Sequence, residues 1–152
     1  MKKLLSAVTV VAVLCAAPAF AADPILGAWK LNVAKSKFDA TPLTAGSRVY
    51  TEKDGLYTLE QKMTSANGKE TSSTATYRDG KEEKQAPGGA SDTTLARKKD
   101  ANTWDFELKK DGKVVGKVHR VVSADGKTLT VQNTGAKLSG GSGDETLVYD
   151  KQ

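Results

Sequence analysis

Few side chains in this sequence have the types and spacing that chemistry at a site requires. His119 is the only histidine, and the sequence contains no His-x-x-x-His, His-Glu-x-x-His or Gly-x-Ser-x-Gly segment. One imidazole without partners can neither hold a metal ion nor activate a nucleophile. We therefore assign no catalytic residue, no metal ligand and no cofactor, and we predict that the protein is not an enzyme.

Turn geometry accounts for many of the glycines and for the carboxylates beside them. Asp54-Gly55, Asp111-Gly112 and Asp125-Gly126 each place Asp before Gly, a pair that favours tight hairpin turns. The run from Gly140 to Gly143 is not followed by Lys-Ser or Lys-Thr. It is therefore predicted to be a hairpin loop and not a phosphate-binding loop.

Arg120 is the side chain best suited to bind a ligand. Strand alternation places it on a face that is otherwise apolar, together with Val114, Gly116, Val118 and Val122. A guanidinium is costly to bury alone, so it should meet water, a carboxylate or an anionic ligand. Two alternatives remain open, namely an internal ion pair with Glu52 and a position on the solvent-exposed face. If Arg120 points inward, its neighbour His119 points outward.

Aromatic side chains supply the candidate apolar wall. Trp104 and Phe106 alternate with charged residues, which predicts that both point inward from one strand. A two-residue turn at Asp54-Gly55 pairs Tyr50 with Leu59 and puts Tyr57 on the same face as Leu59. Inward aromatic residues both fill volume and line pockets. We therefore name Trp104, Phe106 and Tyr57 as candidate ligand contacts.

Short segments rich in Thr, Val, Tyr and Leu separate the turns and must position these side chains. They predict about ten antiparallel strands and no long helix. One short turn, capped by Ser36, is possible in the connection from Ala34 to Gly46. The predicted strands are 26–33, 47–53, 56–63, 70–78, 81–85, 92–98, 103–109, 113–122, 128–133 and 145–150.

A closed, single, antiparallel up-and-down barrel fits these strands best. Closure removes exposed edges, and no other element is available to cover a sheet face. Several inward positions between Thr71 and Tyr77 are polar, which predicts an interior that is partly hydrated and not packed solid. A two-sheet sandwich is the main alternative.

The amino-terminal residues predict export. Lys2 and Lys3 precede an apolar stretch that ends at Cys15, and Ala19-Phe20-Ala21 is the small-x-small pattern read by signal peptidase. We expect a signal peptide over residues 1–21, cleavage near Ala21, and one mature domain over residues 22–152. The mature chain would be periplasmic or secreted, without cysteine and without a membrane-spanning segment.

Charge argues against nucleic acid as a partner. The sequence carries 23 basic and 18 acidic residues, and the two kinds are interleaved. No stripe of one sign is available to follow a phosphate backbone. We expect a monomer whose partner is a small hydrophobic or amphipathic molecule.

The stretch Leu26-Gly27-Ala28-Trp29-Lys30-Leu31-Asn32 and the closing Val148-Tyr149-Asp150-Lys151 resemble the calycin barrels, which include lipocalins and fatty-acid-binding proteins. Together with Lys35-Ser36-Lys37-Phe38, the opening stretch also resembles exported lipocalin-like bacterial proteins. Over the rest of the mature chain, the resemblance lies in the number and spacing of the predicted strands and not in residue identity. It implies a ligand-binding barrel in which Trp29 packs across the closed end.

The same resemblance implies a carboxylate-binding role for two residues. Arg120 falls where fatty-acid-binding proteins carry an inward arginine on the eighth strand, and Tyr149 matches their tyrosine on the tenth. Leu147 stands where the family has a second arginine, so this carboxylate clamp is incomplete. The family also inserts two helices after its first strand, for which Ala34 to Gly46 leaves too little room.

The sequence thus predicts an exported, non-enzymatic barrel that binds a small amphipathic molecule, with Arg120 and Tyr149 holding a polar head. One alternative is an exported interaction module, such as an enzyme inhibitor, that works through the loops Ala34 to Gly46 and Gln85 to Ser91. Another is an envelope barrel with a structural role.

Overall fold

A computed structural model describes residues 22–39, 41–137 and 142–152. The predicted signal peptide, its cleavage site at Ala21 and Cys15 lie outside these residues. Within the described ranges, no helix is long and apolar enough to cross a membrane.

The described chain is all-β, as predicted. It forms ten strands and one short 3-10 turn, η1 (Val33–Lys35). The strands are β1 (Gly27–Leu31), β2 (Leu43–Lys53), β3 (Leu56–Ser65), β4 (Glu70–Tyr77), β5 (Glu82–Lys84), β6 (Thr93–Lys98), β7 (Thr103–Lys110), β8 (Lys113–Val122), β9 (Thr128–Gly135) and β10 (Glu145–Lys151).

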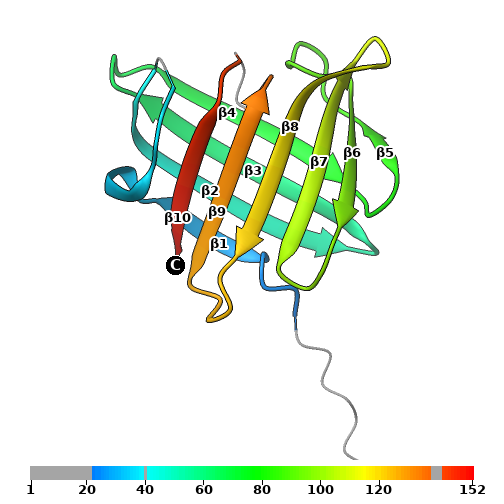
Figure 1. Cartoon of the computed structure of the whole chain (residues 1–152), viewed down its shortest axis with the longest axis horizontal. Coiled ribbons are helices and arrows are strands. Elements are labelled where there is room, and N and C mark those ends of the chain that lie inside the picture. The colour runs from blue at the N-terminus through cyan, green and yellow to red at the C-terminus, as the bar shows by residue number, and fades with distance from the viewer. Residues whose placement is uncertain (1–21, 40, 138–141) are drawn as a thin grey trace, which may run out of the picture.

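All ten strands belong to one antiparallel sheet that curls into a nearly closed barrel. The strand order is β4-β3-β2-β1-β10-β9-β8-β7-β6-β5. Pairing of β1 with β10, for example Trp29 with Lys151, joins the first strand to the last. Figure 1 shows the layer of β7 to β10 crossing in front of β1 to β4. One continuous sheet replaces the two-sheet sandwich, so that alternative is wrong.

The hairpin between β2 and β3 has the register that the turn residues predict. Asp54 and Gly55 both adopt positive φ, at 52° and 76°, as a type I′ turn requires. Tyr50 pairs with Leu59, in agreement with the prediction, and Glu52 pairs with Tyr57. A two-residue turn therefore sets which side chains of both strands face the interior.

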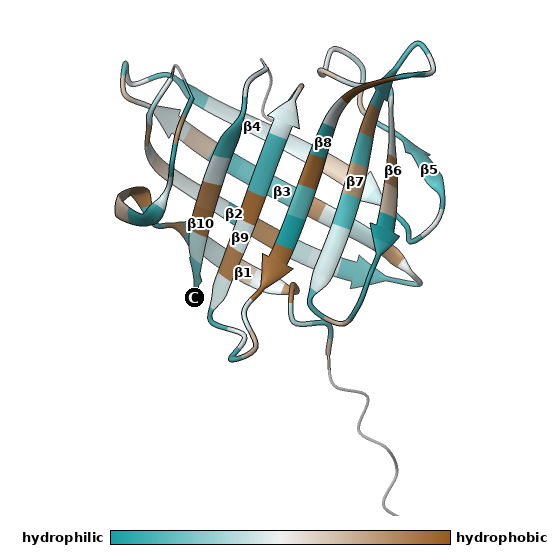
Figure 2. Cartoon of the chain, viewed as in Figure 1, coloured by the Kyte–Doolittle hydropathy of each residue, from teal (hydrophilic) through white to brown (hydrophobic). Residues whose placement is uncertain are grey.

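Alternating burial along the strands builds the core. On β7, Trp104, Phe106 and Leu108 are each 2% exposed or less, while the residues between them are half-buried. Figure 2 shows the same alternation as hydrophobic bands between hydrophilic ones along the strands. The core is thus the inner surface of the barrel, as expected for a single curled sheet.

Two local details differ from the prediction. β2 begins at Leu43, so the connection after β1 is shorter than the predicted range of Ala34 to Gly46. Asn32, and not Ser36, caps the short turn, because its side chain accepts a hydrogen bond from the Lys35 nitrogen at 3.1 Å. Ser36 instead ends the turn, and its hydroxyl accepts a hydrogen bond from the Val148 nitrogen at 3.0 Å.

Candidate functional site

Arg120 lies inside the barrel, as strand alternation predicts. Its side chain on β8 is 1% exposed and shares the inner face with Val118 and Val122. Val114 does not share this face and is 46% exposed. The cause is a register shift opposite Leu108 and Lys109, which pair with Gly116 and Val114 and so skip one residue of β8.

Aromatic rings enclose the Arg120 guanidinium. Its central carbon lies 4.0 Å from the ring centroid of Phe106, 5.5 Å from that of Tyr50 and 5.6 Å from that of Tyr77. A cation over ring faces is stabilised by their negative charge distribution, most strongly where water is excluded. Part of the burial cost of this charge is therefore offset by aromatic contacts.

No carboxylate neutralises Arg120. None of the ion pairs in the described part of the chain involves it, and the remaining residues of the sequence contain neither Asp nor Glu. The predicted alternative of an ion pair with Glu52 is wrong, because Glu52 is exposed and accepts a hydrogen bond from the Gly55 nitrogen at 2.6 Å. The Nε and Nη1 atoms of Arg120 have no hydrogen-bond partner in the part of the chain that the structure describes.

The three predicted aromatic residues gather in one cluster next to Arg120. Tyr57 contacts Trp104 at 5.0 Å between ring centroids, and Trp104 contacts Phe106 at 6.1 Å. Tyr77 completes the cluster, with its ring 5.2 Å from Tyr57 and 4.9 Å from Phe106. Sequence reasoning did not single out Tyr77, because it ends the polar segment in which neither face is strongly apolar.

The interior around Arg120 is closely packed. Trp104, Phe106, Tyr77 and Arg120 are each at most 2% exposed. The sequence predicted open, hydrated space, but large rings projecting from opposite walls meet across the barrel and fill it. A ligand that reaches Arg120 must displace some of these side chains.

Tyr149 is also buried, at 0% exposure, but it lies beside a different arginine. The guanidinium carbon of Arg48, on β2, is 4.8 Å from the Tyr149 ring centroid. Burial raises the pKa of Tyr149 to about 12, so its hydroxyl keeps its proton at neutral pH. Within residues 22–39, 41–137 and 142–152, the only acceptor for this hydroxyl is a weak one, the Met63 sulfur at 3.9 Å.

Arg48 was missed by sequence reasoning. It is 3% exposed, and its Nη1 donates to the Tyr50 hydroxyl at 3.3 Å. The available signal was its parity with Tyr50, two residues along the same strand. Tyr50 contacts both arginines, whereas no hydrogen bond or cation–ring contact in the described part of the chain joins Arg120 to Tyr149.

Unpaired polar atoms mark the interior. Buried side-chain nitrogen and oxygen atoms without a hydrogen-bond partner are Arg48 Nε, Gln61 Oε1, Tyr77 Oη, Thr94 Oγ1, Trp104 Nε1, Arg120 Nε and Arg120 Nη1. Such atoms are rare in folded proteins because each one costs free energy, and each calls for a partner.

One end of the barrel is closed by the residues that precede β1. The Trp29 indole donates to the Ile25 carbonyl at 2.8 Å and is 1% exposed, in line with the expected packing across that end. Asp23 accepts hydrogen bonds from the Tyr57 hydroxyl at 2.9 Å and from Lys98 at 2.6 Å. The Tyr57 hydroxyl is therefore engaged in closing the barrel, and its ring is the part left for a ligand.

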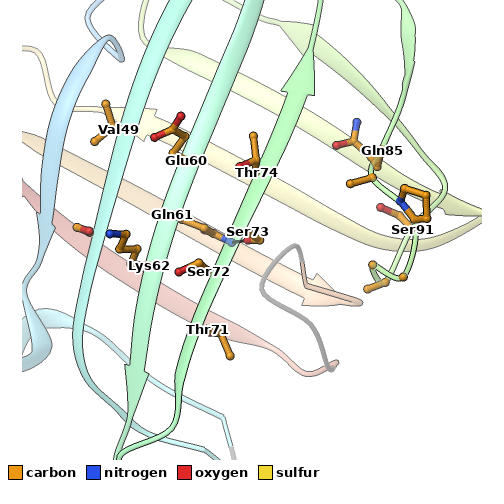
Figure 3. A pocket seen from close by; sticks show the side chains of 16 residues that line it. Val49, Glu60, Gln61, Lys62, Thr71, Ser72, Ser73, Thr74, Gln85 and Ser91 are labelled. Carbon is orange, nitrogen blue, oxygen red and sulfur yellow. Dashed lines mark hydrogen bonds between the residues drawn. The ribbon is translucent and has the colours of Figure 1, made fainter.

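A groove of about 880 Å³ lies where the sheet is not continuous, beside β4 and the connection from Gln85 to Ser91. Two of its lining residues, Gln61 and Ser73, belong to inward-facing rows of β3 and β4, and Figure 3 shows their side chains directed toward each other. The Gln85 side chain bridges the discontinuity, since its amide donates to the Thr76 carbonyl at 2.8 Å.

His119 points outward, as predicted. Its Nδ1 lies 2.6 Å from Asp105 Oδ1, and both side chains are 45% exposed. Within the described ranges, no group of three or more His, Cys, Asp or Glu side chains is placed to hold a metal ion.

Comparison with known proteins shows the fold. No protein-family profile and no curated protein sequence matches this chain. Among solved structures, the fluorescent protein UnaG is similar with a TM-score of 0.59 and 16% identity, over 84% of this chain and 97% of that protein. A fatty-acid-binding protein from Schistosoma mansoni, solved with arachidonic acid, has a TM-score of 0.59 and 14% identity, over 85% and 96% of the two chains.

The ileal bile-acid-binding protein of zebrafish, solved with cholic acid, is similar with a TM-score of 0.58 and 11% identity, over 85% of this chain and 99% of that protein. At these identities the likeness concerns the arrangement of strands and not the residues of a site. The chain therefore shares the antiparallel barrel fold of these solved structures.

Proposed function

We propose that this protein is an exported, monomeric and non-enzymatic binding protein. Its ligand is a small amphipathic molecule with an anionic head, which is held inside the barrel. The observation that carries the proposal is Arg120, a buried guanidinium without a carboxylate partner. A ligand carboxylate would neutralise this charge and accept hydrogen bonds from its unpaired nitrogen atoms. Export rests on the signal-peptide pattern at residues 1–21.

The wall of the site suits an apolar ligand body. Trp104, Phe106 and the ring of Tyr57 form a continuous aromatic surface next to Arg120. Apolar contact supplies affinity in such sites, and a few polar groups fix the orientation of the ligand. Tyr149 would offer its hydroxyl to the head.

Two structural neighbours support the class of ligand. Their structures contain arachidonic acid and cholic acid, each of which joins an apolar body to a carboxylic acid. Because the interior of this protein is filled by its own rings, binding requires side-chain rearrangement, which reduces the affinity by the cost of that change.

Fluorescence titration tests the proposal. The mature chain, residues 22–152, is titrated with 11-(dansylamino)undecanoate and with its uncharged methyl ester. We expect saturable binding of the carboxylate probe that dodecanoate displaces. Arg120→Met should weaken the carboxylate probe roughly 10- to 100-fold, as loss of a charge-assisted contact implies. The ester should lose less than twofold.

Arg97→Met is the matched control, because Arg97 is an exposed arginine on β6. It should bind both probes as the wild-type protein does. Failure of the wild-type protein to bind either probe, combined with capture of a stoichiometric protein partner from envelope extracts, would contradict the proposal and favour an interaction module that works through its loops.

A further inference from the structure

Arg48 is a second buried cation that forms no direct ion pair among the described residues, although the buried carboxylate of Glu145 on β10 acts on it through space. Its guanidinium donates to the Tyr50 hydroxyl at 3.3 Å and lies 4.8 Å from the centroid of the Tyr149 ring, and its Nε has no hydrogen-bond partner among the described residues. None of the ion pairs among residues 22–39, 41–137 and 142–152 involves Arg48. A charge so placed is stabilised when an anion binds beside it.

Polar side chains continue from Arg48 toward the edge of the sheet. Arg48 pairs with Gln61 across β2 and β3, and Gln61 pairs with Ser73 across β3 and β4. The Gln61 Nε2 donates to the Ser73 hydroxyl at 2.8 Å, which leaves its buried Oε1 without a partner. The inner face of three adjacent strands thus carries a polar row in an otherwise apolar wall.

This row ends at the groove. Gln61 and Ser73 are the members of the row that line the 880 Å³ space beside β4, and Figure 3 shows them on β3 and β4, to the left of the connection that carries Gln85 and Ser91. Gln61 is both a neighbour of Arg48 and a wall of the groove. Arg48 does not line the groove itself, but its neighbour on β3, Gln61, does.

Arg120 has different surroundings. Its guanidinium is enclosed by the rings of Phe106, Tyr50 and Tyr77 and is 1% exposed. Tyr149, which was expected to act with Arg120, contacts Arg48 instead. Leu147 on β10 carries no charge. In the described part of the chain, the only guanidinium over the Tyr149 ring is that of Arg48 on β2.

We propose that Arg48, Gln61 and Tyr149 form an anion subsite at the groove end of the interior, which takes the carboxylate head of an apolar ligand. Arg48 supplies the charge, and the Tyr149 hydroxyl donates a hydrogen bond. The Gln61 amide can turn its nitrogen toward the head. The inference rests on the proposed function and adds Arg48 to Arg120 as a second guanidinium that holds the carboxylate head.

The test compares Arg48→Met with Arg120→Met in the mature chain, using 11-(dansylamino)undecanoate and its methyl ester. Arg48→Met should weaken the carboxylate probe roughly 10- to 100-fold, as Arg120→Met should, and the ester by less than twofold. Lys30→Met is the matched control, since it removes an exposed charge from β1 and should change neither affinity.

Three outcomes would overturn the inference, and they are distinguishable. If Arg48→Met binds the carboxylate as tightly as wild type while Arg120→Met does not, the subsite is wrong and the proposed function stands. If Arg48→Met weakens both probes equally, Arg48 supports the barrel wall and not the anion. If the wild-type protein binds neither probe, the proposed function fails as well.

If Arg48→Met does not fold, Arg48→Lys tests the subsite instead. The lysine keeps the charge but cannot reproduce the planar donor geometry of a guanidinium. A drop of at least about threefold for the carboxylate with an unchanged ester supports the subsite. An unchanged ratio of the two affinities overturns it.

Discussion

Arg48 and Tyr149 lie against each other inside the barrel although their strands, β2 and β10, are separated by β1. The guanidinium carbon is 4.8 Å from the ring centroid, and both side chains are at most 3% exposed. Closure of the sheet between β1 and β10 creates this contact. It places a buried positive charge beside a hydroxyl whose only acceptor among the described residues is the Met63 sulfur.

Gln85→Ala should weaken the link between β4 and the connection from Gln85 to Ser91, at the place where the sheet is not continuous. The Gln85 amide donates to the carbonyls of Thr76 at 2.8 Å and Glu83 at 3.1 Å, and so replaces a strand partner for β4. Loss of these bonds should lower the free energy of unfolding by about 1–2 kcal/mol. Stopped-flow mixing should show faster uptake of the dansyl probe. Gln132→Ala, at an exposed glutamine on β9, is the control. Equal uptake rates in Gln85→Ala and wild type would contradict the idea that the Gln85 hydrogen bonds slow ligand entry.

Asp39→Asn should change stability only where the native carboxylate is charged. The hydrogen bond from Lys137, at 2.7 Å, lowers the pKa of Asp39 below its ordinary value of 3.8. A group with a lowered folded-state pKa stabilises the protein above its unfolded-state pKa, and this stabilisation disappears as the pH falls through the folded-state pKa.

Urea denaturation at a series of pH values checks this expectation. Wild type should exceed Asp39→Asn in stability at pH 6, and the two should converge below pH ~3. Asp144→Asn, an exposed carboxylate in the same region of the barrel, should leave the wild-type pH dependence unchanged. A difference that stays constant down to the lowest pH would show that charge at Asp39 is not the cause.

Tyr77→Phe should be neutral or stabilising. The Tyr77 hydroxyl is buried without a partner, while its ring packs against Phe106 at 4.9 Å. Removal of an unsatisfied buried hydroxyl is expected to raise the free energy of unfolding by up to about 1 kcal/mol. Phe106→Ala, by contrast, leaves a cavity and should cost about 3–5 kcal/mol in chemical denaturation. A large loss in Tyr77→Phe would mean that the hydroxyl has a partner in solution.

Gly116→Ala should disrupt the pairing of β8 with β9. A Cβ at Gly116 would lie 2.8 Å from the Ala136 nitrogen and against its carbonyl, and these backbone atoms cannot move aside cheaply. We expect a loss of at least about 2 kcal/mol by thermal or chemical denaturation. Gly89→Ala, whose Cβ would meet atoms no closer than 3.6 Å, should be nearly neutral. Similar stability of the two variants would contradict the close approach.

The sequence predicted the fold where local chemistry decides it. Asp54-Gly55 set the register of its hairpin, and alternation around Trp104 and Phe106 assigned the inner face of β7. Arg120 was placed correctly by the same parity. Val114 was not, because the register shift near it depends on the partner strand and not on the residues of β8.

The candidate site was harder to predict, because its contacts join strands that are distant in sequence. Arg48 shares a face with Tyr50, which the sequence shows, but its place beside Tyr149 depends on closure through β1 and β10. The dense packing around Arg120 likewise results from rings on opposite walls, such as Tyr77 and Phe106, meeting across the barrel. No pattern within one strand reports that meeting.

The central claim is that an anion binds at the buried arginines, and NMR of arginine side chains tests it most directly. The Nε atoms of Arg48 and Arg120 are unpaired donors. With stoichiometric dodecanoate, their Nε–H resonances should shift downfield as hydrogen bonds to the carboxylate form, while those of Arg78 and Arg97 stay in place. Unmoved Arg48 and Arg120 resonances at saturating dodecanoate would contradict the account.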